Sequence, residues 1–393
     1  MKMKKNHRNR KSRAICFLSS MHPYDDKRVF EKEAKSLSNH GYSVIHIAPG
    51  DGTTFMHKGV EIRTFKKQND MSVIKRILNL RNLYSYAKST EADIFHCNEI
   101  DSWIIGLFLK FNINSKCIFD VHEHYPEEFA EVRFHKSLRF FIVPMLYLVI
   151  KSLSIYTDQI VIAKSSLKET FKHLPDHKLK LIQNFSPIKN FEALPSSSNS
   201  KLEENKFKII HLGLFGLARG WYQLLEAMNH LKSENIELIV LGEVNDGSEK
   251  KFINFINKNK LTEKIKYIKW MKIEDALKIV NECDLGLVTF QPGYHNHTHA
   301  LPHKLFDYMG LGLPVLVPNF AVEVCEIVKE SKSGLMIDVS SPLEIAEAIK
   351  SLHENKLLAK EMGANGKEAV YNKFNWENEE LVLLSMYEEL FSK

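Results

Sequence analysis

Cysteine is scarce in this chain of 393 residues, and its distribution argues against a disulfide framework. The cysteines number five and lie far apart, at Cys16, Cys97, Cys117, Cys283 and Cys325. Small secreted folds instead carry even sets of closely spaced cysteines. Several of the five fall in strand-like apolar runs. They are therefore expected to be buried thiols, and the protein is expected to work in the reducing cytoplasm.

The chain also lacks an apolar run long enough for a signal peptide or a membrane span. Before the polar segment that starts at Ser19, only residues 14–18 are apolar, which is too short for a signal sequence. The longest apolar run, residues 140–150, contains Pro144 and has 11 residues, whereas a span needs about 20. We expect this run to be either a core helix or a helix lying in the membrane interface.

The first 24 residues contain no aspartate or glutamate, but they contain seven lysines and arginines. This basic arm contributes strongly to the net charge of +6. It is expected to be either a solvated tail or a segment attracted to an anionic membrane surface, where each cation contributes about 1 kcal/mol. No pattern of basic and aromatic residues continues into the rest of the chain, so nucleic acid is not expected as a partner.

What the sequence does contain is a regular alternation of short β-rich runs and amphipathic helical stretches. This alternation is typical of parallel sheets covered by helices on both faces. A polar stretch, residues 186–205, divides it into two halves. Two doubly wound α/β domains are therefore predicted. Their strands are expected at 14–19, 43–48, 93–97, 116–121 and 159–162, and then at 208–212, 237–241, 264–268, 285–290 and 315–317.

Histidines and acids follow three strands of the first half. Ligands of such sheets bind outside the carboxyl ends of the strands. A cleft that hydrogen-bonds a polyhydroxylated substrate needs side chains of this kind, although helix caps and turn polar groups are the alternative reading. The residues singled out are Asp26, Arg28, His96, Glu99, His122 and Glu123.

In the second half, strand 208–212 runs into a glycine-rich turn that suits an anion. Gly213, Gly216 and Gly220 allow close backbone approach, and Arg219 at the entrance of the next helix can neutralise phosphate. The turn has neither the G-x-G-x-x-G spacing of a dinucleotide site nor the G-K-[ST] ending of a P-loop.

A predicted helix over 302–311 offers a second anion site at its N-terminus, beside Lys304. Pro302 suits the first helical turn, and Gly312 suits a turn that needs positive φ. Asp307 lies about one turn deeper, where a carboxylate can hold a sugar hydroxyl.

No metal site is expected. In an extended loop His295, His297 and His299 face the same way, but a loop is a poor frame for metal ligands. The sequence contains no Asp-x-Asp element that suits Mg²⁺ on a diphosphate. The charge of a diphosphate is therefore left to Arg219, Lys304 and the helix N-terminus.

Taken together, these segments resemble the retaining glycosyltransferases of family 4. The resemblance covers nearly the whole chain and rests on four segments in order, namely 22–44, 119–126, 219–220 and 301–309. It implies the GT-B fold, in which two Rossmann-like domains face each other across a cleft. Residues 1–190 form the acceptor-binding domain, and residues 206–373 form the donor-binding domain. The terminal helix, 374–393, packs back onto the first domain.

The resemblance also implies the roles of the site residues. Arg219 and Lys304 stabilise the leaving diphosphate, and His122 contacts the transferred sugar, with no cofactor and no metal. The donor-binding set is Gly213, Gly216, Arg219, Gly220, His299, Lys304, Leu305 and Asp307, and the acceptor-binding set is Asp26, Arg28, His96, Glu99 and Glu123. Many members carry a Glu at two positions that here hold His299 and Asp307.

The expected function is transfer of a sugar from a nucleotide-sugar donor to a glycan or a lipid-linked glycan, in cell-surface polysaccharide biosynthesis. The protein is expected to be cytoplasmic, with a peripheral contact to anionic membrane. Two alternatives remain open at this point. One is a nucleotide-sugar epimerase of the same shape, and the other is a non-catalytic paralogue that acts as a scaffold.

Overall fold

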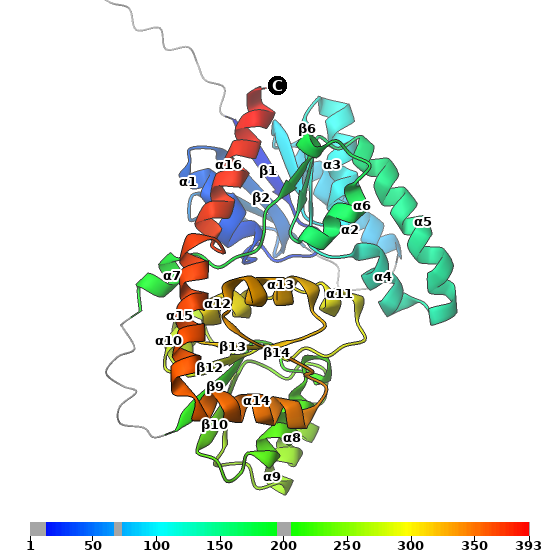
Figure 1. Cartoon of the computed structure of the whole chain (residues 1–393). Helices are drawn as coiled ribbons and strands as arrows, with labels where there is room; N and C mark the ends of the chain where they lie inside the picture. Colours follow the sequence, from blue (N-terminus) through cyan, green and yellow to red (C-terminus); the bar gives the residue numbers. More distant parts are fainter. Residues whose placement is uncertain (1–12, 67–72, 195–205, 393) are drawn as a thin grey trace, which may run out of the picture. The chain divides into compact units, whose positions relative to one another are not determined.

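The structure, a computed structural model, describes residues 13–66, 73–194 and 206–392, which form two compact units. The N-terminal unit takes the chain up to Gln183 and again from Glu379 onward, and the C-terminal unit comprises Asn184–Asn378 (Figure 1). The sequence placed the domain limits at 190, 206 and 373. The chain therefore changes unit a few residues before the first of these positions and a few after the last.

The N-terminal unit is built on an eight-stranded sheet of order β3-β4-β2-β1-β5-β6-β7-β8. All neighbouring strands are parallel except the antiparallel pair β3 and β4. The strands are β1 (Ala14–Leu18), β2 (Ser43–Gly50), β3 (Thr54–His57), β4 (Val60–Lys66), β5 (Ile94–Cys97), β6 (Lys116–Val121), β7 (Gln159–Ile162) and β8 (Leu179–Leu181).

Helices connect most of these strands, as parallel neighbours require, whereas β2 is linked to β4 through β3. They are the π-helical turn η1 (Val29–Ala34), α1 (Lys35–Asn39), α2 (Val73–Lys88), α3 (Ile100–Ile113), α4 (Tyr125–Arg133), α5 (Lys136–Ile155), the short η2 (Ser165–Leu167), α6 (Lys168–Phe171) and η3 (Asp176–Lys178). The last helix of the chain, α16 (Trp376–Ser392), starts in the C-terminal unit and has most of its residues in the N-terminal unit.

The C-terminal unit contains a fully parallel six-stranded sheet of order β11-β10-β9-β12-β13-β14. Its strands are β9 (Phe207–Leu212), β10 (Ile236–Leu241), β11 (Ile265–Ile268), β12 (Leu285–Leu287), β13 (Val315–Pro318) and β14 (Gly334–Ile337). Its helices are α7 (Lys189–Glu192), η4 (Leu217–Arg219), α8 (Trp221–His230), α9 (Glu249–Lys258), α10 (Ile273–Asn281), α11 (His295–Thr298), α12 (His303–Gly310), α13 (Val322–Ser331), α14 (Pro342–Glu354) and α15 (Lys356–Asn372).

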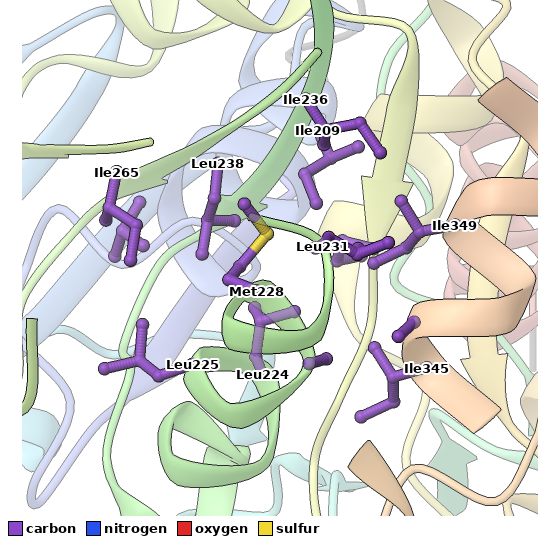
Figure 2. Packing of buried hydrophobic residues seen from close by; sticks show 14 of the residues in the cluster. Ile209, Leu224, Leu225, Met228, Leu231, Ile236, Leu238, Ile265, Ile345 and Ile349 are labelled. Atoms are coloured by element: carbon purple, nitrogen blue, oxygen red, sulfur yellow. The ribbon is translucent and has the colours of Figure 1, made fainter. Parts of the chain in front are cut away.

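The core of the C-terminal unit lies on both faces of this sheet because successive strand residues point to opposite sides. On β9, Ile209 packs with α8 and α14, whereas Ile210 and Leu212 pack with α10, α12 and α13 on the other face. Figure 2 shows the first of these layers, in which Leu224 and Met228 of α8 approach the strands. Burial on both faces explains why the strands read as continuous apolar runs.

The turn around α12 follows the sequence prediction closely, with one shift. Gly312 has φ +78°, so the expected positive-φ turn is confirmed. Pro302 is not in the first helical turn; it is the N-cap, with φ −77° and ψ 138°, and the helix starts at His303. The loop before it also differs, because residues 295–298 form the short helix α11 instead of the predicted extended loop.

Helix α5 decides between the two interpretations of the apolar run 140–150. It spans 20 residues, and only 11% of its most apolar 18-residue window is buried. The core-helix prediction is therefore wrong. By length and composition α5 is a helix that could cross a membrane. In the structure it packs beside α4 along one side (Figure 1). Its apolar side chains on another side are exposed.

Candidate functional site

Each sheet has one point where its strand order reverses direction, and the candidate residues gather at these two points. In the N-terminal unit the reversal lies between β1 and β5, and in the C-terminal unit it lies between β9 and β12. The loops that leave neighbouring strands in opposite directions open a crevice at such a point, which is where doubly wound sheets bind ligands.

In the N-terminal unit, Glu99 ties together the two loops at this point. It precedes α3 and forms a capping box with Ser102. Its carboxylate also accepts hydrogen bonds from three successive backbone amides of the loop after β1, those of Ser20, Met21 and His22, at 2.9–3.1 Å. Glu99 therefore shapes the loop that carries His22.

Arg28 is the centre of a buried ionic cluster. Its guanidinium donates to both carboxylate oxygens of Asp120 at 2.9 Å and lies 3.0 Å from Glu33. Burial alone would raise the pKa of Asp120, but the charge of Arg28 and the interactions with His122 outweigh it and hold that pKa well below its ordinary range. Burial raises the pKa of Glu33 well above its ordinary value, despite the nearby guanidinium. Asp120 therefore carries the charge that balances Arg28.

His122 lies at the end of β6 next to this cluster. Its Nε2 atom is 2.7 Å from Oδ2 of Asp120, and its side chain keeps 16% of its surface exposed. An ionised carboxylate only accepts hydrogen bonds, so this contact needs the proton on Nε2. The neutral ring then presents an unprotonated Nδ1. The ring of His22 stands edge-on to that of His122, with 5.8 Å between centroids. A hydrogen bond with Asp26 raises the pKa of His22.

The structure corrects the predicted acceptor contacts of Arg28 and His96, because both side chains are buried. Arg28 is 4% exposed and His96 is fully buried. The Nδ1 atom of His96 is 2.7 Å from the hydroxyl of Tyr387 on α16. Both residues support the fold of this region.

The other predicted acceptor residues are also engaged within the N-terminal unit. Asp26 accepts hydrogen bonds from the backbone amides of Arg28 and Val29, and Glu123 forms an ion pair with Lys164. Burial alone would raise the pKa of Asp26, but its hydrogen bonds with His22 and Val29 lower it.

Glu33, His96 and Asp120 bring potential metal-ligand atoms within 4.8 Å of one another. The guanidinium of Arg28 already ion-pairs with both carboxylates of this group. A second cation would be repelled by it, so the arrangement suits a buried arginine and not a metal ion.

In the C-terminal unit, the glycine-rich loop after β9 is held in place by the loop after β12. The side-chain hydroxyl of Thr289 donates to the backbone carbonyl of Arg219 at 2.9 Å. The backbone N–H of Gln291 donates to the backbone carbonyl of Ala218, also at 2.9 Å. Gly220 has φ +83°, and a Cβ atom there would lie 2.3 Å from the carbonyl oxygen of Thr289. Only glycine fits this contact, which fixes the position of Arg219.

Lys304, on the first turn of α12, lies at the end of β9. Its ammonium is 3.1 Å from Nε2 of His211, the buried histidine of that strand. Burial and the positive charge of Arg219 lower the pKa of Lys304 to about 7. Burial and the charge of Lys304 also hold the pKa of His211 well below its ordinary value. The two cations, Lys304 and Arg219, therefore repel each other across a site that favours an anion.

The remaining predicted donor residues are Asp307, His299 and Leu305. Asp307 is 5% exposed, and its Oδ1 atom accepts a hydrogen bond of 2.6 Å from the hydroxyl of Ser186. His299 follows α11, with its ring 5.1 Å from that of His295. Leu305 is a correction, because its side chain is fully buried in the core and its backbone amide donates to the carbonyl of Pro302.

Residues 195–369 match the family described as Glycosyl transferases group 1. The C-terminal unit carries a group 1 glycosyl transferase domain. The loop 213–220, Lys304 and Asp307 all belong to this domain.

Curated relatives are named as glycosyltransferases. The chain is 23% identical over 231 residues to the uncharacterized glycosyltransferase MJ1069 of Methanocaldococcus jannaschii, covering 58% of this chain and 56% of the relative. It is 22% identical over 274 residues to the capsular polysaccharide biosynthesis glycosyltransferase CapM of Staphylococcus aureus, covering 64% of this chain and 66% of the relative. The matches thus span between half and two thirds of the relatives' lengths.

Solved structures match over nearly the whole chain. Sucrose-phosphate synthase from Thermosynechococcus elongatus has a TM-score of 0.75 at 17% identity, covering 97% of this chain and 99% of that one. The Anabaena protein HepE in complex with UDP-glucose has a TM-score of 0.73 at 17% identity, covering 97% and 100%. Together with the two parallel-sheet units, these neighbours show that the chain has the GT-B fold.

Three residues of the candidate site were missed by the sequence analysis, namely Asp120, Glu33 and His211. Asp120 and His211 each interrupt an apolar strand, and charged or titratable side chains are rarely buried without a partner. That interruption is the signal that was available. Glu33 lies on a helix and shows no comparable signal.

Proposed function

We propose that this chain is a retaining glycosyltransferase that transfers a sugar from a nucleotide-sugar donor to a glycan or lipid-linked glycan acceptor in the cytoplasm. The observation that carries the proposal is the pair of cations at the end of β9. Arg219 helps to hold the pKa of Lys304 at about 7, so an anion placed between them relieves a repulsion that the fold has built in. A diphosphate supplies that anion.

Three features of the C-terminal unit support a diphosphate in this place. Lys304 lies in the first turn of α12, where backbone amides point outward and the helix dipole favours negative charge. Gly220 and its contact with Thr289 hold the backbone of Arg219. The group 1 match covers these elements, and the neighbouring protein HepE was solved in complex with UDP-glucose.

The proposed reaction breaks the bond between the anomeric carbon of the sugar and the leaving phosphate oxygen. The acceptor oxygen forms the new bond on the same face, and its proton passes to an oxygen of the leaving phosphate. Lys304 and Arg219 stabilise the negative charge that grows on the diphosphate, which is the type of interaction that contributes most to many enzymes. No metal takes part in this proposal.

His122 has a separate proposed role, contact with the transferred sugar. Because the Nε2–H group of His122 donates a hydrogen bond to Asp120, the neutral form of the ring can accept a hydrogen bond at Nδ1. A sugar hydroxyl is a suitable donor for it. We expect His122→Ala to lower kcat about fivefold, since one hydrogen bond contributes about 1 kcal/mol.

The test of the proposal is a binding screen followed by product analysis. Nucleotide sugars with uridine, guanosine and thymidine bases are titrated into the wild-type protein, with and without EDTA. Arg219→Ala and Lys304→Ala should weaken the strongest binder by at least tenfold. Lys278→Ala is the matched control, because Lys278 is an exposed lysine paired with Asp275. The anomeric configuration of the product is then read by NMR.

The outcomes separate the proposal from its rivals. A protein that binds no nucleotide sugar, or that keeps its cellular function with both alanine substitutions, is a scaffold. Release of an epimerised nucleotide sugar without acceptor identifies an epimerase. Loss of activity in EDTA contradicts the metal-independent mechanism.

A further inference from the structure

The outward face of α5 is apolar along its whole length. The exposed residues at positions 138, 141, 145, 148 and 155 recur at intervals of three, four or seven residues, so they form one stripe on the helix, which Phe140 and Val149 flank. The exposed fractions are 78% for Phe140, 71% for Phe141 and 66% for Leu148. The stripe with its two flanking residues, which we call the α5 face, consists of Leu138, Phe140, Phe141, Met145, Leu148, Val149 and Ile155, all exposed.

The opposite side of α5 is bonded to the N-terminal unit. The hydroxyl of Tyr147 donates to the carboxylate of Glu127 on α4 at 2.7 Å, and Arg139 donates to two backbone carbonyls at 2.9 and 3.0 Å. Ile150 is buried between the helix and the sheet, and Ser154 lies 2.9 Å from His173. A helix that spans a membrane would have to give up all of these contacts. The structure instead offers one face to a surface and keeps the other in the fold.

The apolar surface continues onto the neighbouring helix α3. Phe108 and Phe111 are exposed there, and the ring of Phe111 meets that of Tyr156 edge-on with 6.1 Å between centroids. The ammonium of Lys110 donates to the carbonyl of Tyr156 at 2.8 Å, which joins the ends of the two helices. Contiguous apolar surface of this kind marks an interaction site in soluble proteins.

The charges around the α5 face indicate which partner it fits. The segment 136–155 contains Lys136, Arg139 and Lys151 and no acidic residue. Lys136 and Lys151 are exposed and stand towards the two ends of the stripe. A two-fold pair of this helix, whether its copies run parallel or antiparallel, sets like charges against each other at both ends. Anionic lipid headgroups meet both lysines favourably.

We propose that α5 is an interfacial anchor whose exposed face lies in the boundary between headgroups and acyl chains of an anionic bilayer. The helix axis runs parallel to the membrane surface. Phe108 and Phe111 of α3 extend the contact, and Lys136 and Lys151 bind lipid phosphates. This is the arrangement of a monotopic amphipathic helix, with aromatic and aliphatic side chains inserted and cations at the rim. The proposal does not depend on the catalytic function of the chain.

The first experiment places a fluorescent probe in the α5 face of the full chain. Phe141→Trp is compared with Leu357→Trp, since Leu357 is an 81% exposed leucine on α15 of the C-terminal unit. Each is mixed with vesicles of phosphatidylglycerol and phosphatidylcholine that contain doxyl-labelled lipid. The fluorescence of the four native tryptophans is subtracted. We expect a blue shift and strong quenching for Phe141→Trp, and neither for Leu357→Trp.

The second experiment removes the contact. Phe141→Glu combined with Leu148→Glu should weaken vesicle binding more than tenfold, because two side chains no longer enter the acyl region. Leu357→Glu combined with Leu381→Glu is the control, as these leucines are 81% and 66% exposed. All four side chains are exposed, so the melting temperature should stay within a few degrees of the wild type.

Two results would overturn the proposal. If the α5 double variant binds vesicles as tightly as the wild type, another part of the chain, such as the basic arm, makes the contact. If the wild type ignores vesicles but sediments as a dimer that the α5 variant dissociates, a second copy of the chain covers this face. Equal binding to phosphatidylcholine alone would exclude the role of Lys136 and Lys151.

Discussion

Asp120 receives two hydrogen bonds from Arg28 and one from His122, so a single carboxylate both neutralises a buried arginine and orients a partly exposed histidine. The arrangement couples the interior of the N-terminal unit to its surface. Asp120 lies on β6, and Arg28 precedes the π-helical turn η1. The position of His122 therefore depends on packing between segments that are 92 residues apart in the sequence.

Arg28→Met is expected to destabilise the protein by about 3–5 kcal/mol at neutral pH, because it leaves two buried acids without a cation. Burial then raises the folded-state pKa of both Asp120 and Glu33 above their ordinary values of 3.8 and 4.5. An acid with a raised folded-state pKa loses stability as the pH rises. The variant should therefore approach the wild type at pH 4.5 and fall behind it at pH 7, as measured by urea unfolding.

Arg63→Met provides the matched control. Arg63 forms an ion pair of 2.7 Å with Glu61, and both side chains are partly exposed. Pairs of this kind contribute at most about 1 kcal/mol. An equal loss in the free energy of unfolding for Arg28→Met and Arg63→Met would show that the buried cluster stabilises the protein no more than the partly exposed ion pair does.

The affinity for the nucleotide-sugar donor should fall as the pH rises through 7. Lys304 has a pKa of about 7, so it loses its proton between pH 6 and pH 8 and with it the attraction to a diphosphate. Binding should also take up a proton near pH 7, which calorimetry in two buffers of different ionisation enthalpy detects. Lys304→Met should weaken binding by about tenfold to a hundredfold, the value of a charge-assisted hydrogen bond.

Lys304→Arg is the control for this pH profile, since an arginine stays charged throughout the range. It should bind the donor with an affinity that changes little from pH 6 to pH 8. A profile in Lys304→Arg as steep as that of the wild type would assign the titration to another group.

Gly220→Ala should destabilise the C-terminal unit and weaken donor binding. The new Cβ would stand 2.3 Å from the carbonyl oxygen of Thr289, so the backbone around Arg219 must shift. Gly247→Ala is the comparison, because Gly247 has nearly the same φ, +78° against +83°, and nothing within 4 Å of its Cβ position. Both pay about 1–2 kcal/mol for left-handed backbone, and only Gly220→Ala adds about 1–3 kcal/mol of overpacking. Similar melting temperatures for the two would argue against the close contact.

Asp307→Ala should abolish discrimination between a ribose and a 2′-deoxyribose donor. If its carboxylate holds a ribose hydroxyl, the wild type should prefer the ribonucleotide sugar by about tenfold or more. Ser186→Ala removes the 2.6 Å hydrogen bond to Asp307 but keeps the carboxylate, so it should keep the preference. Titration of both donors into both variants measures it. A wild type that binds the two donors equally well would remove Asp307 from the ribose site.

The alternation of strands and helices could be predicted because β-rich runs such as Lys116–Val121 and Gln159–Ile162 are buried on both faces. The antiparallel pair β3 and β4 was missed because it breaks that rhythm. Its turn is Lys58-Gly59, with φ of 46° and 84°, and this two-residue signal is short. β14 was also missed, and its side chains are mostly half-buried, which weakens the apolar pattern.

The candidate site was harder to predict than the fold because the type of a residue does not reveal which other residue or ligand its side chain contacts. Arg28 and His96 have the chemistry of substrate contacts, yet their partners Asp120 and Tyr387 come from distant segments and bury them. Composition likewise left α5 undecided between the core and a membrane. Only tertiary packing shows which face of that helix is covered.

The path of the chain means that the N-terminal unit is interrupted in sequence by the whole of the C-terminal unit. Its second part, Glu379–Lys393, is synthesised only after the whole of the C-terminal unit. Tyr387 belongs to this part and meets His96 in the interior. While the ribosome is still translating residues 184–378, the N-terminal unit therefore lacks the segment whose Tyr387 contacts His96. Its folding can finish only after residues 379–392 have been synthesised, and a stop codon before Tyr387 would remove this contact from the unit whose synthesis began first.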